Sequence, residues 1–98
     1  MEYSFDAELF TWRSNPSWHF VNLPVDVSKE IQELAKDFKR GFGSVRVDIL
    51  VGKTFWRTSI FPNTDEKCFI LPVKKQVRVK EKLEIGQKIE FKVDLVDF

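Results

Sequence analysis

The stretch VRVDILVGKTFWRTSIF, residues 45–61, decides the fold of this chain. In its first half Val and Ile recur at every second position, with Arg and Asp between them, which is typical of a half-buried strand. Gly52-Lys53 is a two-residue turn signal, and residues 54–61 form the expected returning strand. The stretch therefore predicts an antiparallel β-hairpin.

Further short strands are expected on both sides of this hairpin. Apolar and polar residues alternate near both termini, and two extended runs each stop at a Leu-Pro pair, where proline disfavours helix in the residue before it. A Ser-Asn-Pro-Ser loop is expected at residues 14–17. The expected strands cover residues 3–9, 18–23, 67–71 and 89–95, so the chain has six or seven strands in all.

One amphipathic helix is expected at about residues 26–40, and a short helical turn near residues 74–82. The longer helix has a single apolar face. Asp26 or Ser28 is expected to cap its start, and Gly41 to end it. The apolar face consists of Val27, Ile31, Leu34, Ala35 and Phe38.

Length and composition favour a single β-barrel domain over residues 1–98. Ten Phe and three Trp among 98 residues supply more buriable surface than a disordered chain carries. Evenly spaced short strands with turn signals indicate a barrel or a sandwich. A small closed or partly open barrel of six to seven strands, with the helix over one opening, is the economical arrangement, because closure removes exposed strand edges.

A short phrase occurs twice in the chain. Residues 20–25, FVNLPV, are similar to residues 68–73, CFILPV, and each copy precedes a charged, helix-compatible segment, a Gly and an alternating strand. Repetition of this kind suggests two related strand–helix–strand halves. The linking lengths differ, so duplication and chance similarity both stay open.

Four segments together resemble a known family. They are WHFVNLP (18–24), GSVRV (43–47), GKTFWRTSIFP (52–62) and FILPVKKQVR (69–78). The chain resembles the bacterial "domain of unknown function 1905" family, DUF1905, over nearly its whole length. The resemblance implies a double-split β-barrel, distantly related to the AbrB/MazE-type regulators. Relatives commonly have a Gly in the loop that corresponds to residues 63–67, which here contains none.

The charge is balanced overall but not along the chain. Lys and Arg total 16 and Asp and Glu total 15, so the formal net charge is +1, which is unlike a general nucleic-acid binder. Residues 1–38 contain seven acids and three bases, whereas residues 67–92 contain eight bases and three acids. No apolar run reaches the roughly 18 residues of a membrane span, and the acidic N-terminus differs from a signal peptide. A cytoplasmic protein that does not contact a membrane is expected.

A candidate ligand site combines the returning strand of the hairpin with the basic segment near the second Leu-Pro-Val. An aromatic ring stacks on flat ligands, and a guanidinium holds an anion. In a small barrel, however, Trp is usually core. Trp18 and Trp56 are therefore expected in the core, with Trp12 undecided. The candidate site residues are Trp56, Arg57, Ser59, Lys74, Lys75 and Arg78.

No catalytic, metal or cofactor constellation is expected. His19 is the only histidine, and no motif activates it or Ser59 as a base or a nucleophile. Cys68 is the only cysteine, lies in an apolar run and is expected to be buried. A zinc site needs about three or four protein ligands, which these residues do not supply.

The sequence therefore favours a non-enzymatic module that binds a small anionic ligand or a protein partner. The alternative is an AbrB/MazE-like DNA-binding regulator. Asp26, Glu30 and Glu33 follow the first Leu-Pro, where a DNA-binding surface needs Lys or Arg, so nucleic acid is possible but not favoured. Both a monomer and a dimer fit these patterns.

Overall fold

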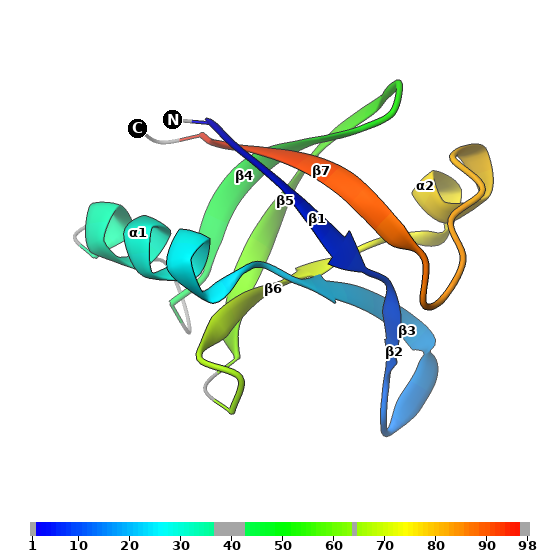
Figure 1. Ribbon diagram of the computed structural model, residues 1–98, viewed down its shortest axis with the longest axis horizontal. Coiled ribbons are helices and arrows are strands. Elements are labelled where there is room, and N and C mark those ends of the chain that lie inside the picture. Colours follow the sequence, from blue (N-terminus) through cyan, green and yellow to red (C-terminus); the bar gives the residue numbers. More distant parts are fainter. Residues whose placement is uncertain (1, 37–42, 64, 97–98) are drawn as a thin grey trace.

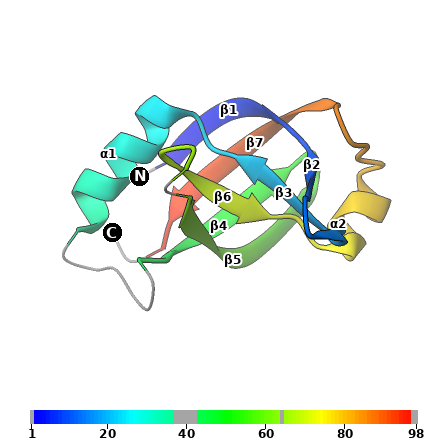
Figure 2. The ribbon, with the colours of Figure 1, turned by 90° about the horizontal axis from the view of Figure 1, so that it is seen from below.

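The computed structural model describes residues 2–36, 43–63 and 65–96, and these form a mainly β molecule (Figure 1). The described strands make one curled, half-barrel antiparallel sheet in the order β1-β7-β4-β5-β6-β3-β2. Helix α1 (Val25–Ala35) and helix α2 (Lys75–Lys80) lie at opposite ends of the sheet (Figure 2). The strands are β1 (Glu2–Glu8), β2 (Phe10–Trp12), β3 (Asn15–Asn22), β4 (Val45–Val51), β5 (Thr54–Asn63), β6 (Cys68–Pro72) and β7 (Lys88–Leu95).

The alternating segments bury one face each, as their period predicts. Every second residue of β4 and of β7 is buried, and the residues between them are half-buried or exposed. The Phe5 and Phe91 rings stack with their centroids 6.1 Å apart across the β1–β7 ladder. The core therefore lies inside the curl of the sheet, where Val47, Ile49 and Phe91 are fully buried.

The predicted hairpin is confirmed. β4 pairs with β5 from Val51 opposite Thr54 to Val45 opposite Ile60. Gly52 has a φ of 57°, so it supplies the positive φ that the first central residue of a type II′ turn requires. The turn also meets the end of α2, because the Thr54 hydroxyl donates to Glu81 Oε2 at 2.6 Å.

Helix α1 is shorter in the described chain than its expected range, since residues 37–42, with Phe38 and Gly41, lie outside the described residues. The cap prediction is wrong. Pro24 occupies the N-cap position, and Ser28 is buried inside the helix, where its Oγ accepts the Phe69 amide proton at 3.0 Å. Among the described residues, no helix is long and apolar enough to cross a membrane.

Other boundaries differ by a few residues. The helical turn expected near residues 74–82 is α2, Lys75–Lys80. The expected loop at residues 14–17 is largely strand, because β3 already begins at Asn15, and the turn lies at residues 13–14. The described chain also contains the short strand β2, which pairs with β3 from Phe10 opposite Phe20.

The two Leu-Pro-Val copies occupy equivalent places. β3 leads into α1 and then β4, and β6 leads into α2 and then β7. The ladders also match, since β3 pairs with β6 around Val21 opposite Leu71, and β4 pairs with β7 around Val47 opposite Leu95. The two copies of the phrase lie 48 residues apart, and Asn22 and Val47 each pair with the residue 48 positions further along the chain, Ile70 and Leu95. The described halves are therefore related by an approximate twofold arrangement.

Candidate functional site

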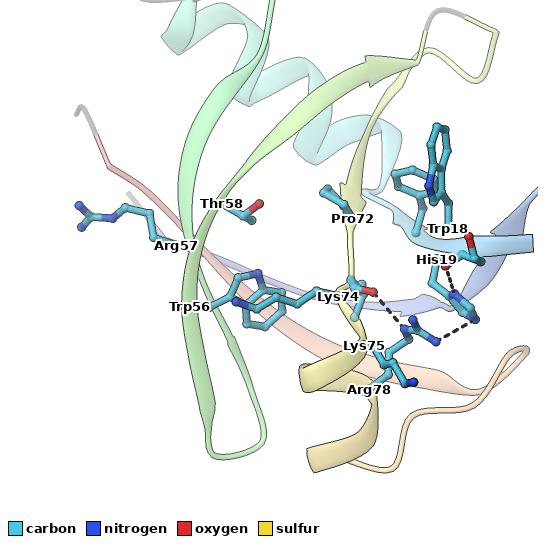
Figure 3. A pocket seen from close by; sticks show the side chains of 12 residues that line it. Trp18, His19, Trp56, Arg57, Thr58, Pro72, Lys74, Lys75 and Arg78 are labelled. Carbon is cyan, nitrogen blue, oxygen red and sulfur yellow. Dashed lines mark hydrogen bonds between the residues drawn. The ribbon is translucent and has the colours of Figure 1, made fainter. Parts of the chain in front are cut away.

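The sheet splits between β5 and β6, and a pocket lies at the split. β5 pairs with β4 over Thr54–Ile60, whereas its ladder with β6 covers Phe61–Asn63. Beyond that ladder β6 turns towards β3 and leads into α2. A pocket of about 840 Å³ opens there (Figure 3). Its lining comes from residues 17–20, 56–58 and 72–75 and from Arg78.

The apolar part of the pocket is aromatic. Trp56 belongs to the core and is 8% exposed, which confirms its expected burial, and it also lines the pocket. Trp18 is 54% exposed, so its expected place in the core is wrong. Phe20 also lines the pocket and packs edge-on against Trp12, with ring centroids 5.3 Å apart. Trp18 is left outside the core because it points away from the buried side of β3, on which Val21 lies.

The basic part of the pocket contains an anchored arginine. Arg78 Nε donates to the Val73 carbonyl at 3.1 Å, and Arg78 Nη1 lies 3.2 Å from His19 Nε2 (Figure 3). A guanidinium only donates, so Nε2 must be the acceptor. The proton of a neutral His19 ring then lies on Nδ1, which is 3.2 Å from the Ser17 carbonyl and donates to it. This network holds the guanidinium plane at the pocket wall, beside the exposed Lys74 and Lys75.

The structure brings together most, but not all, of the predicted site residues. Trp56, Lys74, Lys75 and Arg78 line one pocket. Arg57 also borders it, but the Arg57 side chain points to the other face of β5 (Figure 3).

That outer face of β5 also contains Ser59. Arg57 Nε donates to Asp48 Oδ1 at 2.8 Å, and Ser59 lies opposite Arg46 in the same ladder. Strand alternation separates Arg57 and Ser59 from Trp56, so Thr58, two residues from Trp56, lines the pocket instead. The same alternation places Ser59 on the other face of β5 from the pocket that His19 lines.

Electrostatics on the outer face concern Asp48. The hydrogen bond from Arg57 is the largest effect and lowers the pKa of the Asp48 carboxyl. Desolvation, the next largest, opposes it, and the charges of Arg57 and Arg46 lower the pKa further. The Asp48–Arg57 pair is therefore an ion pair of the outer face.

The cysteine lies beside a second cavity. Cys68 is buried, as expected, next to a cavity of about 350 Å³ between α1 and the β5–β6 loop. Burial raises the pKa of the Cys68 thiol, and Glu66 adds to the rise. A protonated, buried thiol is a poor nucleophile. Among the described residues, no three His, Cys, Asp or Glu side chains are placed to hold a metal ion.

Comparison with known proteins identifies the family of the chain. The family model of DUF1905, a domain of unknown function, matches residues 5–93 of the chain, which includes every residue of the pocket. No curated protein matches the chain. Since the family model covers nearly all of its 98 residues, the chain belongs to the DUF1905 family.

Proposed function

We propose that this protein is a non-catalytic binding module whose pocket at the β5–β6 split takes an anionic ligand with an apolar body. One observation carries the proposal: the Arg78 guanidinium is held by Val73 and His19 in the wall of a pocket that Trp56 also lines. An arginine fixed in this way loses less conformational freedom when it binds a carboxylate, so its fork is ready for the ligand.

The composition of the lining supports this ligand class. Ligand pockets are mostly apolar with a few placed polar groups, and the two tryptophans and Pro72 beside Arg78 match that pattern. Lys74 and Lys75 add positive charge at the same place. A flat, apolar carboxylate complements these groups, because the ring packs on indole and the carboxylate accepts from the guanidinium.

The test uses phenylacetate and its neutral analogue phenylacetamide as probes of isotopically labelled protein in NMR titrations. We expect phenylacetate to shift the Trp18 and Trp56 indole resonances and to bind roughly tenfold or more tightly than the amide, because a hydrogen bond to a charged group contributes about 1.5–3 kcal/mol. Arg78→Gln should remove this preference. Lys29→Glu on α1 is the matched control, at the opposite end of the sheet, and should leave binding unchanged. Equal binding of acid and amide would contradict the proposal.

We also propose that the half-barrel is a double-split barrel built from two ββαβ halves. In support, the sheet order starts with β1 and ends with β2, which are separated by Leu9 alone. β5 likewise pairs first with β4 and then with β6. An experimental structure in which β1 does not lead from β7 towards β3 would contradict this architecture.

A further inference from the structure

We infer that His19 takes up a proton when the pocket binds its anion, and that it thereby changes from the acceptor of an Arg78 hydrogen bond into a second donor to the ligand. The inference rests on the proposed function of the same pocket and adds a second ligand contact and a pH dependence. Three features carry it: the direction of the His19–Arg78 hydrogen bond, the hydrogen bond on the other side of the His19 ring, and the charges that line the pocket.

The His19–Arg78 hydrogen bond exists only while the His19 ring is neutral. All N–H groups of a guanidinium are donors, so Arg78 Nη1 needs the lone pair of His19 Nε2, 3.2 Å away. A protonated imidazole has no such lone pair, because both of its nitrogens then carry hydrogen. Protonation of His19 therefore breaks this hydrogen bond and leaves two cationic donors side by side at the pocket wall.

Both partners have a second anchor that does not depend on this proton. Nδ1 of His19 lies 3.2 Å from the Ser17 carbonyl and can donate to it from the neutral and from the charged ring. Nε of Arg78 donates to the Val73 carbonyl at 3.1 Å. Arg78 Nη1 and His19 Nε2 consequently stay neighbours after protonation (Figure 3), and one carboxylate can accept from both.

The charges of the pocket lining couple the proton to the anion. Lys74 and Lys75 line the pocket beside Arg78, and none of the described lining residues is acidic. An anion in the pocket therefore supplies the negative charge that a protonated His19 ring needs. Because such coupling is reciprocal, a proton on His19 raises the affinity for the anion by the same factor as the anion raises the affinity for the proton.

The elements around His19 bring other groups to its vicinity, but these are neutral or already paired. β2 places Thr11 opposite His19, and the Val73 amide donates to the His19 carbonyl. β1 also packs against β3, but its acidic residues are exposed and none of them lines the pocket. Arg57 borders the pocket and pairs with Asp48 on the outer face of β5. The anion is thus the acceptor that the protonated ring finds in the described pocket.

The test titrates phenylacetate into isotopically labelled protein between pH 5.5 and pH 8, a range in which such a carboxylate is ionised. The affinity should rise by about tenfold from pH 8 to pH 5.5, because the charged ring adds a hydrogen bond to a charged acceptor. His19 is the only histidine, so its ring signals are unambiguous. At pH 6.5 the ring nitrogen resonances should move towards the charged form when phenylacetate is added. An unchanged ring overturns the inference in the wild-type protein alone.

Two variants assign the pH dependence to His19. His19→Gln keeps a side chain that can accept from Arg78 and donate to a carboxylate, but an amide does not titrate. This variant should bind phenylacetate with the same affinity at pH 5.5 and at pH 8. Lys74→Gln is the matched control, because a lysine charge is constant over this range. It should weaken binding at both pH values and keep the rise towards pH 5.5.

The outcomes separate this inference from the proposed function. A preference for phenylacetate over phenylacetamide with the same affinity at pH 5.5 and pH 8 overturns the role of His19, and the anion pocket survives. A pH dependence that persists in His19→Gln also overturns it, because another group then takes up the proton. A preference for the acid that persists in Arg78→Gln and vanishes in His19→Gln supports His19 and overturns the proposed role of Arg78. Binding of phenylacetate at no pH overturns both.

Discussion

At the residue scale, Gly52 combines a backbone and a steric requirement. Its φ is 57°, and a Cβ built at this position meets the Glu81 carboxylate, which accepts the Thr54 hydroxyl. Gly52→Ala should therefore lower the free energy of unfolding through two effects. An Ala in the left-handed conformation costs about 1–2 kcal/mol. Loss of the Thr54–Glu81 hydrogen bond costs roughly 1.5–3 kcal/mol more. Chemical denaturation measures the sum.

Gly86 provides the matched control for this substitution. Its φ is 84°, and nothing lies within 4 Å of a Cβ built there, so Gly86→Ala carries the backbone effect without a collision. We expect Gly86→Ala to be the milder variant of the two. Equal denaturation midpoints would show that Glu81 moves aside freely and that the turn–α2 contact adds no stability.

Asp48 gives a pH-dependent prediction. Its pKa is lowered below 3.8 in the folded chain, chiefly by the hydrogen bond from Arg57. A depressed carboxyl pKa stabilises the fold above the unfolded value, and this stability is lost as the pH falls through the folded value. Asp48→Asn should therefore lower the denaturation midpoint near neutral pH, and the difference from wild type should fade at strongly acidic pH. Asp6→Asn, opposite Glu90, is the control. A difference between Asp48→Asn and wild type that is constant with pH would contradict the assignment.

The candidate site shows which residues a sequence pattern can predict. Trp56 was expected in the core and lies there, and period-two alternation correctly separates it from Arg57 and Ser59. The same rule shows that a site using all three side chains at once is impossible on one strand face. The His19–Arg78 contact joins residues 59 positions apart, and no local pattern in the sequence signals it.

At the element scale, α1 is tied to β6 by one buried hydroxyl. Ser28 is 4% exposed, and its Oγ accepts the Phe69 amide proton. Ser28→Ala leaves that amide without its acceptor and should lower the free energy of unfolding by about 1–3 kcal/mol. Denaturation and the exchange rate of the Phe69 amide both report the loss. Ser4→Ala, on the exposed face of β1, should change stability by less than about 0.5 kcal/mol; a similar effect of both variants would refute a special role for Ser28.

Elements with a strong period were predictable and their partners were not. The strands β1, β4 and β7 follow from alternation, because each buries one side. The split of β5 between β4 and β6 depends on which strand lies beside it, and this is settled by the packing of the two halves rather than by any residue of β5. The pocket follows from that split, so its existence was not readable from the sequence although several of its residues were.

At the scale of the whole molecule, the approximate twofold arrangement relates two helices of opposite character. α2 and the residue before it contribute Lys74, Lys75 and Arg78 at one end of the sheet. α1 contributes Asp26, Glu30 and Glu33 at the other end. A protein that binds DNA through symmetric halves needs both ends to be basic, because phosphate neutralisation dominates its affinity. The near-neutral charge of the chain thus arises from two ends that differ in sign.

This asymmetry predicts weak DNA binding whose affinity depends only shallowly on salt. If only Lys74, Lys75 and Arg78 contact phosphates, the slope of log K against log salt should be no steeper than about −2.7, at about −0.9 per phosphate contact. Gel shifts of a duplex at increasing salt should show retardation, if any, only at low salt, and Lys74→Glu with Lys75→Glu should abolish it, whereas Lys29→Glu should not. A slope near −6, which corresponds to about six or seven phosphate contacts, would require a second basic surface and would restore the DNA-binding alternative.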